Sequence, residues 1–143
     1  MAITDTASSP TGRTHRSRGL AVTGFIATLA AMVATTLVAA LAQAFGVDFE
    51  VDGGETIPLS GIAVVTGFFS LVGVIMAAAF LRWSARPAER FVLTAVSLTA
   101  ISLVPPLLSG ADAATTIALV GLHLVAAAVM IPTLARSLRA RNG

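Results

Sequence analysis

The sequence predicts an all-α protein, an antiparallel bundle of four transmembrane helices with both termini in the cytoplasm. Its 143 residues are 56% hydrophobic and only 11% charged, with a mean hydropathy of +0.90, whereas soluble domains carry about 25% charged residues. Four runs without Asp, Glu, Lys or Arg, each 21 to 29 residues long, cover residues 19–47, 56–81, 91–111 and 113–135. Because about 20 apolar residues in an α-helix cross the hydrocarbon core of a bilayer, each run predicts one membrane span.

The charged residues predict the orientation of these spans. All nine basic residues are arginines that flank alternate ends of the spans, in the groups Arg13, Arg16, Arg18; Arg82, Arg86, Arg90; and Arg136, Arg139, Arg141. Five of the seven acidic residues occupy the other two connectors, namely Asp48, Glu50, Asp52, Glu55 and Asp112. Since arginine-rich connectors face the cytoplasm, this alternation places both termini inside.

Composition also limits the partners and the chemistry. The net charge of +2 comes from arginines with a single aromatic residue, Trp83, among them, so we expect contacts with anionic headgroups of the lipid bilayer and no nucleic acid. The absence of cysteine excludes disulfides and cysteine-ligated metals. The chain contains no phosphate-binding glycine loop, no H-E-x-x-H and no G-x-S-x-G motif, so we predict no cofactor and no metal.

Residues 1–18 carry no apolar periodicity and predict a disordered cytoplasmic tail before a membrane domain over residues 19–136. The first helix is expected at about 20–46, where Gly46 suits a left-handed helix end. The preceding arginines and Ala42-Gln43-Ala44 also resemble a secretory signal with its cleavage site. The uncharged run is longer than the apolar core of a signal peptide, so a permanent anchor is the preferred interpretation.

Apolar and acidic residues alternate over residues 47–52, and Gly53-Gly54 follows. This pattern predicts a short extended segment and a turn on the outer surface. Asp48, Glu50 and Asp52 fall on one side of that segment, which permits a weak Ca²⁺ or Mg²⁺ site, although a solvated acidic face explains them better. The second helix is expected at about 56–81, with Pro58 in its first turn.

The third and fourth helices are expected at about 91–109 and 113–135, followed by a basic cytoplasmic tail at 137–143. Pro105-Pro106 predicts a break near the outer end of the third helix, because prolines lack amide donors and clash with the preceding turn. The connector between these helices is only four residues long, Ser109 to Asp112. The two helices must therefore be adjacent and antiparallel.

Small residues at helical spacing predict where helices pack. Because lipid is as apolar as leucine, the hydrophobic effect does not drive helices together in a membrane, and close van der Waals packing becomes the main source of stability. One stripe lies in the second helix and one in the fourth; they consist of Ala63, Gly67, Ser70, Gly73, Ala77 and of Ala114, Ala118, Gly121, Ala128. Packing within one chain is the preferred interpretation, and a homodimer through one stripe is the alternative.

His123 is the only ionisable residue inside any of the four runs. It lies ~16 Å below the start of its helix, near the bilayer midplane, where ionisable groups are costly and usually functional. The alternative is a hydrogen bond that joins helices, for which Ser70, Ser97, Thr99 and Ser102 are the expected partners. Asp112, Thr116 and Leu119 share the helical face of His123 and predict a shaft that opens outward.

Asp112 and Glu55 precede the fourth and second helices, where a carboxylate can cap free amides. They also stand at the mouth of the expected shaft, so proton transfer to a lipophilic substrate would use Glu55, Asp112 and His123 as acid/base groups. Asp112 and His123 are too far apart to touch. Polar contacts to such a ligand would come from Thr116, Ser70 and Ser102.

With Glu55-Thr56-Ile57-Pro58-Leu59 before its second helix and the tight connector Ser109 to Asp112, the chain resembles small four-helix actinobacterial membrane proteins of unknown function over about residues 20–135. The resemblance implies a multi-pass protein of the bacterial plasma membrane and no particular activity. Two other small four-helix families fit less well. The chain lacks the glutamate that small multidrug transporters carry in their first helix, and it lacks the cysteines of disulfide-forming membrane enzymes.

Two classes of function remain open. The first is a membrane protein that binds a lipophilic small molecule in an outward-opening pocket, with or without isomerase or cyclase activity. The second is a non-catalytic assembly or accessory subunit whose small-residue stripes bind the helices of a membrane partner. A proton-coupled dimeric transporter is disfavoured because the spans contain a single ionisable residue.

Overall fold

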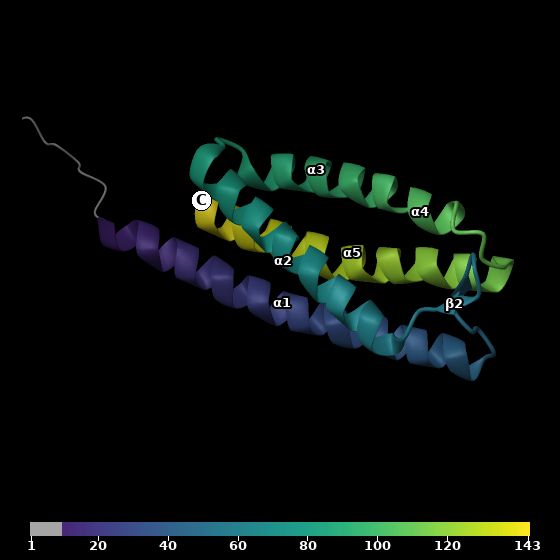
Figure 1. Ribbon diagram of the computed structural model, residues 1–143. Coiled ribbons are helices and arrows are strands. Elements are labelled where there is room, and N and C mark those ends of the chain that lie inside the picture. Colours follow the sequence, from purple (N-terminus) through teal and green to yellow (C-terminus); the bar gives the residue numbers. More distant parts are fainter. Residues whose placement is uncertain (1–9) are drawn as a thin grey trace, which may run out of the picture.

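The computed structural model describes residues 10–143, in which long helices run antiparallel to one another (Figure 1). The long helices are α1 (Pro10–Ala44), α2 (Leu59–Trp83), α3 (Pro87–Ser102) and α5 (Ala113–Asn142). A single turn, α4 (Val104–Leu107), extends α3, and two short strands, β1 (Glu50–Val51) and β2 (Glu55–Thr56), pair between α1 and α2. Four segments of the described chain are long and apolar enough to cross a membrane. The predicted four-helix transmembrane bundle is therefore confirmed.

The helices close into a ring, since α1 contacts α2 and α5, and α3 contacts the same two helices. The expected adjacency of the third and fourth spans is thus confirmed, and the tight connector explains it. Large apolar side chains cover the outside of the bundle, including Phe68 and Ile75, which are 61% and 68% exposed. Soluble monomers rarely expose apolar surface so extensively, which fits lipid as the surrounding solvent.

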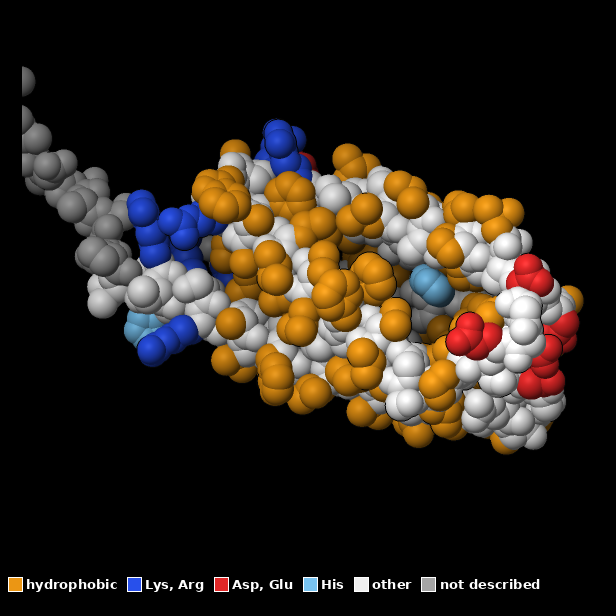
Figure 2. All heavy atoms as spheres, in the orientation of Figure 1, with side chains coloured by type: hydrophobic (Ala, Val, Ile, Leu, Met, Phe, Trp, Pro, Cys, Tyr) orange, Lys and Arg blue, Asp and Glu red, His pale blue; other side chains and the backbone are white. Residues whose placement is uncertain are grey.

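Charge is separated along the bundle. On the face shown in Figure 2, arginines gather at one end, carboxylates at the other, and apolar side chains cover the band between them. At the basic end, Arg141 Nη1 donates to the backbone oxygen of Arg16 (3.2 Å), and Asn142 Nδ2 donates to that of Ala85 (3.5 Å). These bonds join the start of α1, the α2–α3 connector and the end of α5, so the three arginine groups meet as predicted. We call this region the basic end and the opposite one the acidic end.

Two helix ends differ from the sequence expectation. α1 begins at Pro10, so residues 10–18 are helical instead of disordered, and α5 continues through the expected basic tail to Asn142; residues 1–9 lie outside the described part. In α5 the reason is packing, because Leu134 and Leu138 are fully buried one turn apart. The first charged residue after an apolar run indicates where the membrane ends, but it does not end the helix. The helix continues while its apolar face packs against a neighbouring helix.

The predicted break in the third span is confirmed. α3 ends at Ser102, and α4 restarts after Leu103 with prolines in its first turn. In the first turn of a helix the backbone amides have no hydrogen-bond acceptor within the helix. Proline therefore loses no helical hydrogen bond at these positions. The same rule explains why α3 begins at Pro87, earlier than the expected residue 91.

The small-residue stripes are partly confirmed. On α2, Gly67, Ser70 and Ala77 are buried, and a Cβ atom on Gly67 would lie 2.9 Å from Met32 Sδ of α1. The stripe on α5 is not the packing surface that we predicted, since Ala114 and Ala128 are exposed. The partner of α2 is instead a buried stripe on α1 that the sequence reading missed, formed by Gly24, Ala27, Ala31, Thr35 and Ala39.

Candidate functional site

The acidic end of the bundle is closed by one aromatic side chain. Phe49 precedes the β-hairpin, is fully buried and packs in a cluster with Ala39, Ile62, Leu119 and Leu122. Its backbone is left-handed (φ 54°), a conformation that costs a non-glycine residue about 1–2 kcal/mol. The apolar positions of the alternating segment 47–52 were the sequence signal for this contact, but they did not show that Phe49 turns into the bundle.

The hairpin behind Phe49 is tied to the neighbouring connector. Gly53 and Gly54 form its turn with positive φ values of 92° and 76°, which glycine adopts without strain. Ile57 N donates to Phe49 O (3.1 Å), and Asp52 N donates to Ser109 O (3.0 Å). The expected extended segment and turn are therefore present, and they lie against the α4–α5 connector.

The packing of Phe49 bears on the outward-opening shaft that the sequence predicted. Leu119, which shares a helical face with Asp112, Thr116 and His123, is buried in the Phe49 cluster. Phe49 therefore packs beside Leu119, on the face where the shaft was expected to open. Thr116 is half-buried, and its Oγ1 lies 3.5 Å from Ala111 O as a donor.

Asp112 caps α5 as predicted. Its Oδ1 accepts a hydrogen bond from Thr115 N at 2.9 Å. Hydrogen bonds from Thr115, first from its side-chain hydroxyl and then from its backbone amide, lower the pKa of the Asp112 carboxyl below the ordinary value of 3.8. The carboxylate is therefore held ionised at the positive end of the helix dipole.

This cap predicts an acid-sensitive contribution to stability. Because the pKa of Asp112 is lower in the folded state, its stabilisation is present above the unfolded pKa and disappears as pH falls through the folded value. We expect Asp112→Ala to lower the thermal unfolding temperature in detergent at about pH 7, and the difference from wild type to shrink as the pH falls below 3.8. Asp112→Asn should keep a cap without the pH dependence. Asp48→Ala, at an exposed carboxylate of the connector, is the control, and an equal effect of that variant would contradict the assignment.

Glu55 does not cap α2, which corrects the prediction. It lies exposed in β2, and the N-cap of α2 is Pro58, without a side-chain cap. The segment from Thr56 to Pro58 continues the hairpin, so the helix starts later than expected. Within residues 10–143, no hydrogen bond or ion pair joins Glu55, Asp112 and His123. The structure therefore does not connect the three proposed acid/base groups to one another.

His123 is half-buried on α5, and its Nδ1 lies 2.7 Å from Leu119 O, one turn earlier on the same helix. Figure 2 shows a hollow near the acidic end of the bundle, with a histidine side chain in it. Since a carbonyl can only accept, Nδ1 carries the proton in this contact, and in the corresponding tautomer of an imidazole Nε2 is the acceptor. Among the described residues, Nε2 has no hydrogen-bond partner.

Three of the four hydroxyl groups expected to join His123 to other helices bond elsewhere. Ser97, Thr99 and Ser102 donate to backbone oxygens of α3 itself, at 2.8, 2.8 and 2.7 Å. Ser70 is buried on α2.

The interhelical hydroxyl contact of the described chain is Thr35 Oγ1 to Thr66 Oγ1, at 3.2 Å between α1 and α2. Sequence reasoning missed this pair, because threonines in membrane helices usually bond to their own backbone.

Residues 10–143 hold no group of three His, Asp or Glu side chains that could bind a metal ion. In the acidic connector, Asp48, Glu50 and Asp52 are exposed. Two shallow apolar grooves are present, of about 430 and 300 Å³. Neither is lined by any of the predicted site residues, which are Glu55, Ser70, Ser102, Asp112, Thr116 and His123. The larger lies between α3 and α5, and the smaller is lined by Met32, Val33, Thr36, Leu37 and Ala63.

The fold and these side chains define a small multi-pass membrane protein with a capped and closed acidic end and one half-buried imidazole. The chain belongs to a family of unknown function (DUF6069), which matches residues 15–140. No curated protein and no solved structure matches the chain. The actinobacterial origin that the resemblance implied stays a prediction.

Proposed function

We propose that this protein binds a lipophilic molecule beside His123, and that Nε2 accepts a hydrogen bond from a hydroxyl group of that molecule. The observation that carries the proposal is the imidazole itself, with Nδ1 on Leu119 O (2.7 Å) and the ring only partly buried within an apolar span. A polar atom at this depth costs free energy unless it has a partner. In hydrocarbon, a hydroxyl-bearing ligand supplies one.

Binding is favoured over isomerase or cyclase chemistry. A general acid and a general base that act on one substrate must each lie within hydrogen-bond reach of the atom that they protonate or deprotonate, directly or through one water. Asp112 lies eleven residues before His123, ~16 Å along the helix axis, and is engaged as the cap of α5. Glu55 is exposed in the hairpin. Thr116, Ser70 and Ser102 remain proposed polar contacts of the ligand.

The proposed setting is the bacterial plasma membrane, with the basic end and both termini in the cytoplasm. The separation of arginines and carboxylates along the bundle supports this orientation. Under it, His123 lies in the outer half of the bilayer or near its midplane. The ligand would reach His123 laterally from the lipid, since Phe49 is packed into the acidic end.

A photoreactive long-chain alkanol tests the proposal on the purified full chain in detergent. We expect labelling of α5 peptides around His123, reduced about fivefold in His123→Phe, because a neutral hydrogen bond is worth about 1 kcal/mol. The matching photoreactive alkane, which lacks the hydroxyl, should label wild type and variant equally.

The second histidine provides the control for this experiment. His15→Phe makes the same substitution at an exposed position of the basic end and should leave alkanol labelling unchanged. Circular dichroism and size-exclusion chromatography establish that both variants fold. Equal labelling of wild type and a folded His123→Phe protein would refute the proposed function.

A second candidate, a non-catalytic subunit of a membrane complex or a homodimer, is favoured by one observation. The small-residue stripe of α5 leaves Ala114 and Ala128 exposed, and a Cβ atom on Gly121 would meet no atom of the described residues within 4 Å. Small residues facing lipid permit close approach of another helix. A stoichiometric partner or dimer after mild detergent extraction would support this candidate, and a solitary monomer would count against it.

A further inference from the structure

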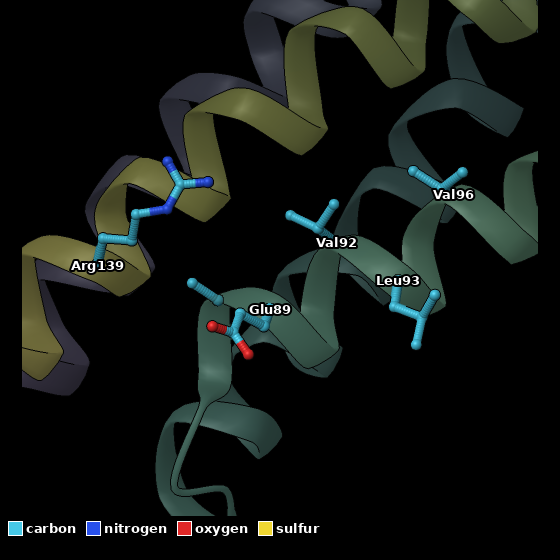
Figure 3. Close-up of a pocket in the computed structure, with 6 residues that line it drawn as sticks. Glu89, Val92, Leu93, Val96 and Arg139 are labelled. Carbon is cyan, nitrogen blue, oxygen red and sulfur yellow. The ribbon is translucent and has the colours of Figure 1, made fainter.

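The larger groove has a polar mouth and an apolar floor. Its lining residues are Ala88, Glu89, Val92, Leu93 and Val96 of α3 and Arg139 of α5. In Figure 3, Val92 and Val96 project from successive turns of α3, and Arg139 lies across from them on α5. The groove therefore extends from the first turn of α3 at the basic end to Val96, ~12 Å deeper along the helix axis.

The charges around this mouth favour an anion. Glu89 is paired with Arg86, at 3.5 Å between Oε2 and Nη1. Arg139 makes no hydrogen bond and no ion pair with any residue of the described chain, so its five N–H donors remain available. The nine arginines belong to the three groups that meet at this end, and Glu89 is the one Asp or Glu side chain of the described residues there.

We propose that the groove is a site for one anionic phospholipid, with its phosphate on Arg139 and an acyl chain along Val92 and Val96. Arginine binds phosphate through two parallel hydrogen bonds, which a zwitterionic headgroup weakens because it carries its own cation. The valines offer an apolar wall below the headgroup level, where an acyl chain lies. Charge complementarity and the direction of the groove thus select the same occupant. The site is distinct from the proposed ligand site at His123 and does not depend on it.

Native mass spectrometry of the full chain tests the headgroup part of this proposal. We expect a first phosphatidylglycerol to bind more tightly than phosphatidylcholine, and Arg139→Gln to weaken that first binding about five- to tenfold. Arg136→Gln is the matched control, since Arg136 belongs to the same arginine group but does not line the groove. Equal loss in both variants would mean general attraction to the basic end and would overturn the site.

The acyl-chain part has its own variants. Val96→Trp fills the groove and should weaken the first phosphatidylglycerol about as strongly as Arg139→Gln, although every arginine remains. Leu98→Trp places the same side chain at an exposed position of α3 outside the groove and should have no effect. Inorganic phosphate, which lacks an acyl chain, should not compete with the lipid. Competition by phosphate, or an unchanged affinity of Val96→Trp, would overturn the assignment to a phospholipid.

Discussion

Replacing Phe49 with alanine should lower the free energy of unfolding by about 3 kcal/mol or more, the cost of emptying a fully buried aromatic site. Phe49 is the largest side chain of the buried cluster at the acidic end, and it connects α1, α2 and α5 through Ala39, Ile62 and Leu119. Its left-handed backbone is already unfavourable, so packing must exceed that strain for the observed conformation to persist. Once the ring is removed, the hairpin has lost the contact that holds it in place.

Phe45→Ala is the control for this prediction, because Phe45 has the same side chain four residues earlier but is 82% exposed. Unfolding of both variants by denaturing detergent, followed by circular dichroism, measures the difference. Limited proteolysis should also cut the hairpin of Phe49→Ala faster, since the segment 50–56 would open more often. If the two variants unfolded at the same detergent fraction, Phe49 would not be the closure of the acidic end.

The four spans could be predicted from the sequence because the bilayer imposes a length and a polarity that no other environment demands. Helix ends could not, because charge marks the membrane boundary and packing decides where the helix stops. Leu138 shows the difference, as it is fully buried beyond Arg136. The break at Pro105-Pro106 was predictable because the missing amide donors act locally.

Within the candidate site, local interactions were predictable and distant ones were not. The Asp112 cap depends on residues three positions apart in sequence, and the structure contains it. The contacts of Phe49, and the bond from Thr35 to Thr66, depend on how helices are placed in space. Small-residue stripes occur on α1, α2 and α5, and the sequence alone could not tell which of them face protein and which face lipid, because alanine and glycine suit both.

The contact between α1 and α2 leads to the second large expected effect. A Cβ atom on Gly24 would lie 2.6 and 2.7 Å from the two Cγ atoms of Val74, and valine in a helix has essentially one rotamer with which to respond. Gly24→Leu must therefore separate the two helices along the buried stripe that includes Ala27 and Ala31. We expect a loss of about 3 kcal/mol in the free energy of unfolding, at the upper end of the usual cost of overpacking.

Gly73→Leu separates this steric effect from helix propensity. Gly73 is the residue before Val74 on α2, and a Cβ atom there would meet nothing within 4 Å among residues 10–143. Both variants replace glycine inside a helix and gain about 1 kcal/mol of propensity, so only Gly24→Leu should destabilise the bundle. Adding Val74→Ala to Gly24→Leu removes the opposing methyl groups and should restore part of the loss, because contacting sites couple. Equal stability of Gly24→Leu and Gly73→Leu in detergent unfolding would show that α1 and α2 are not in close contact at this point.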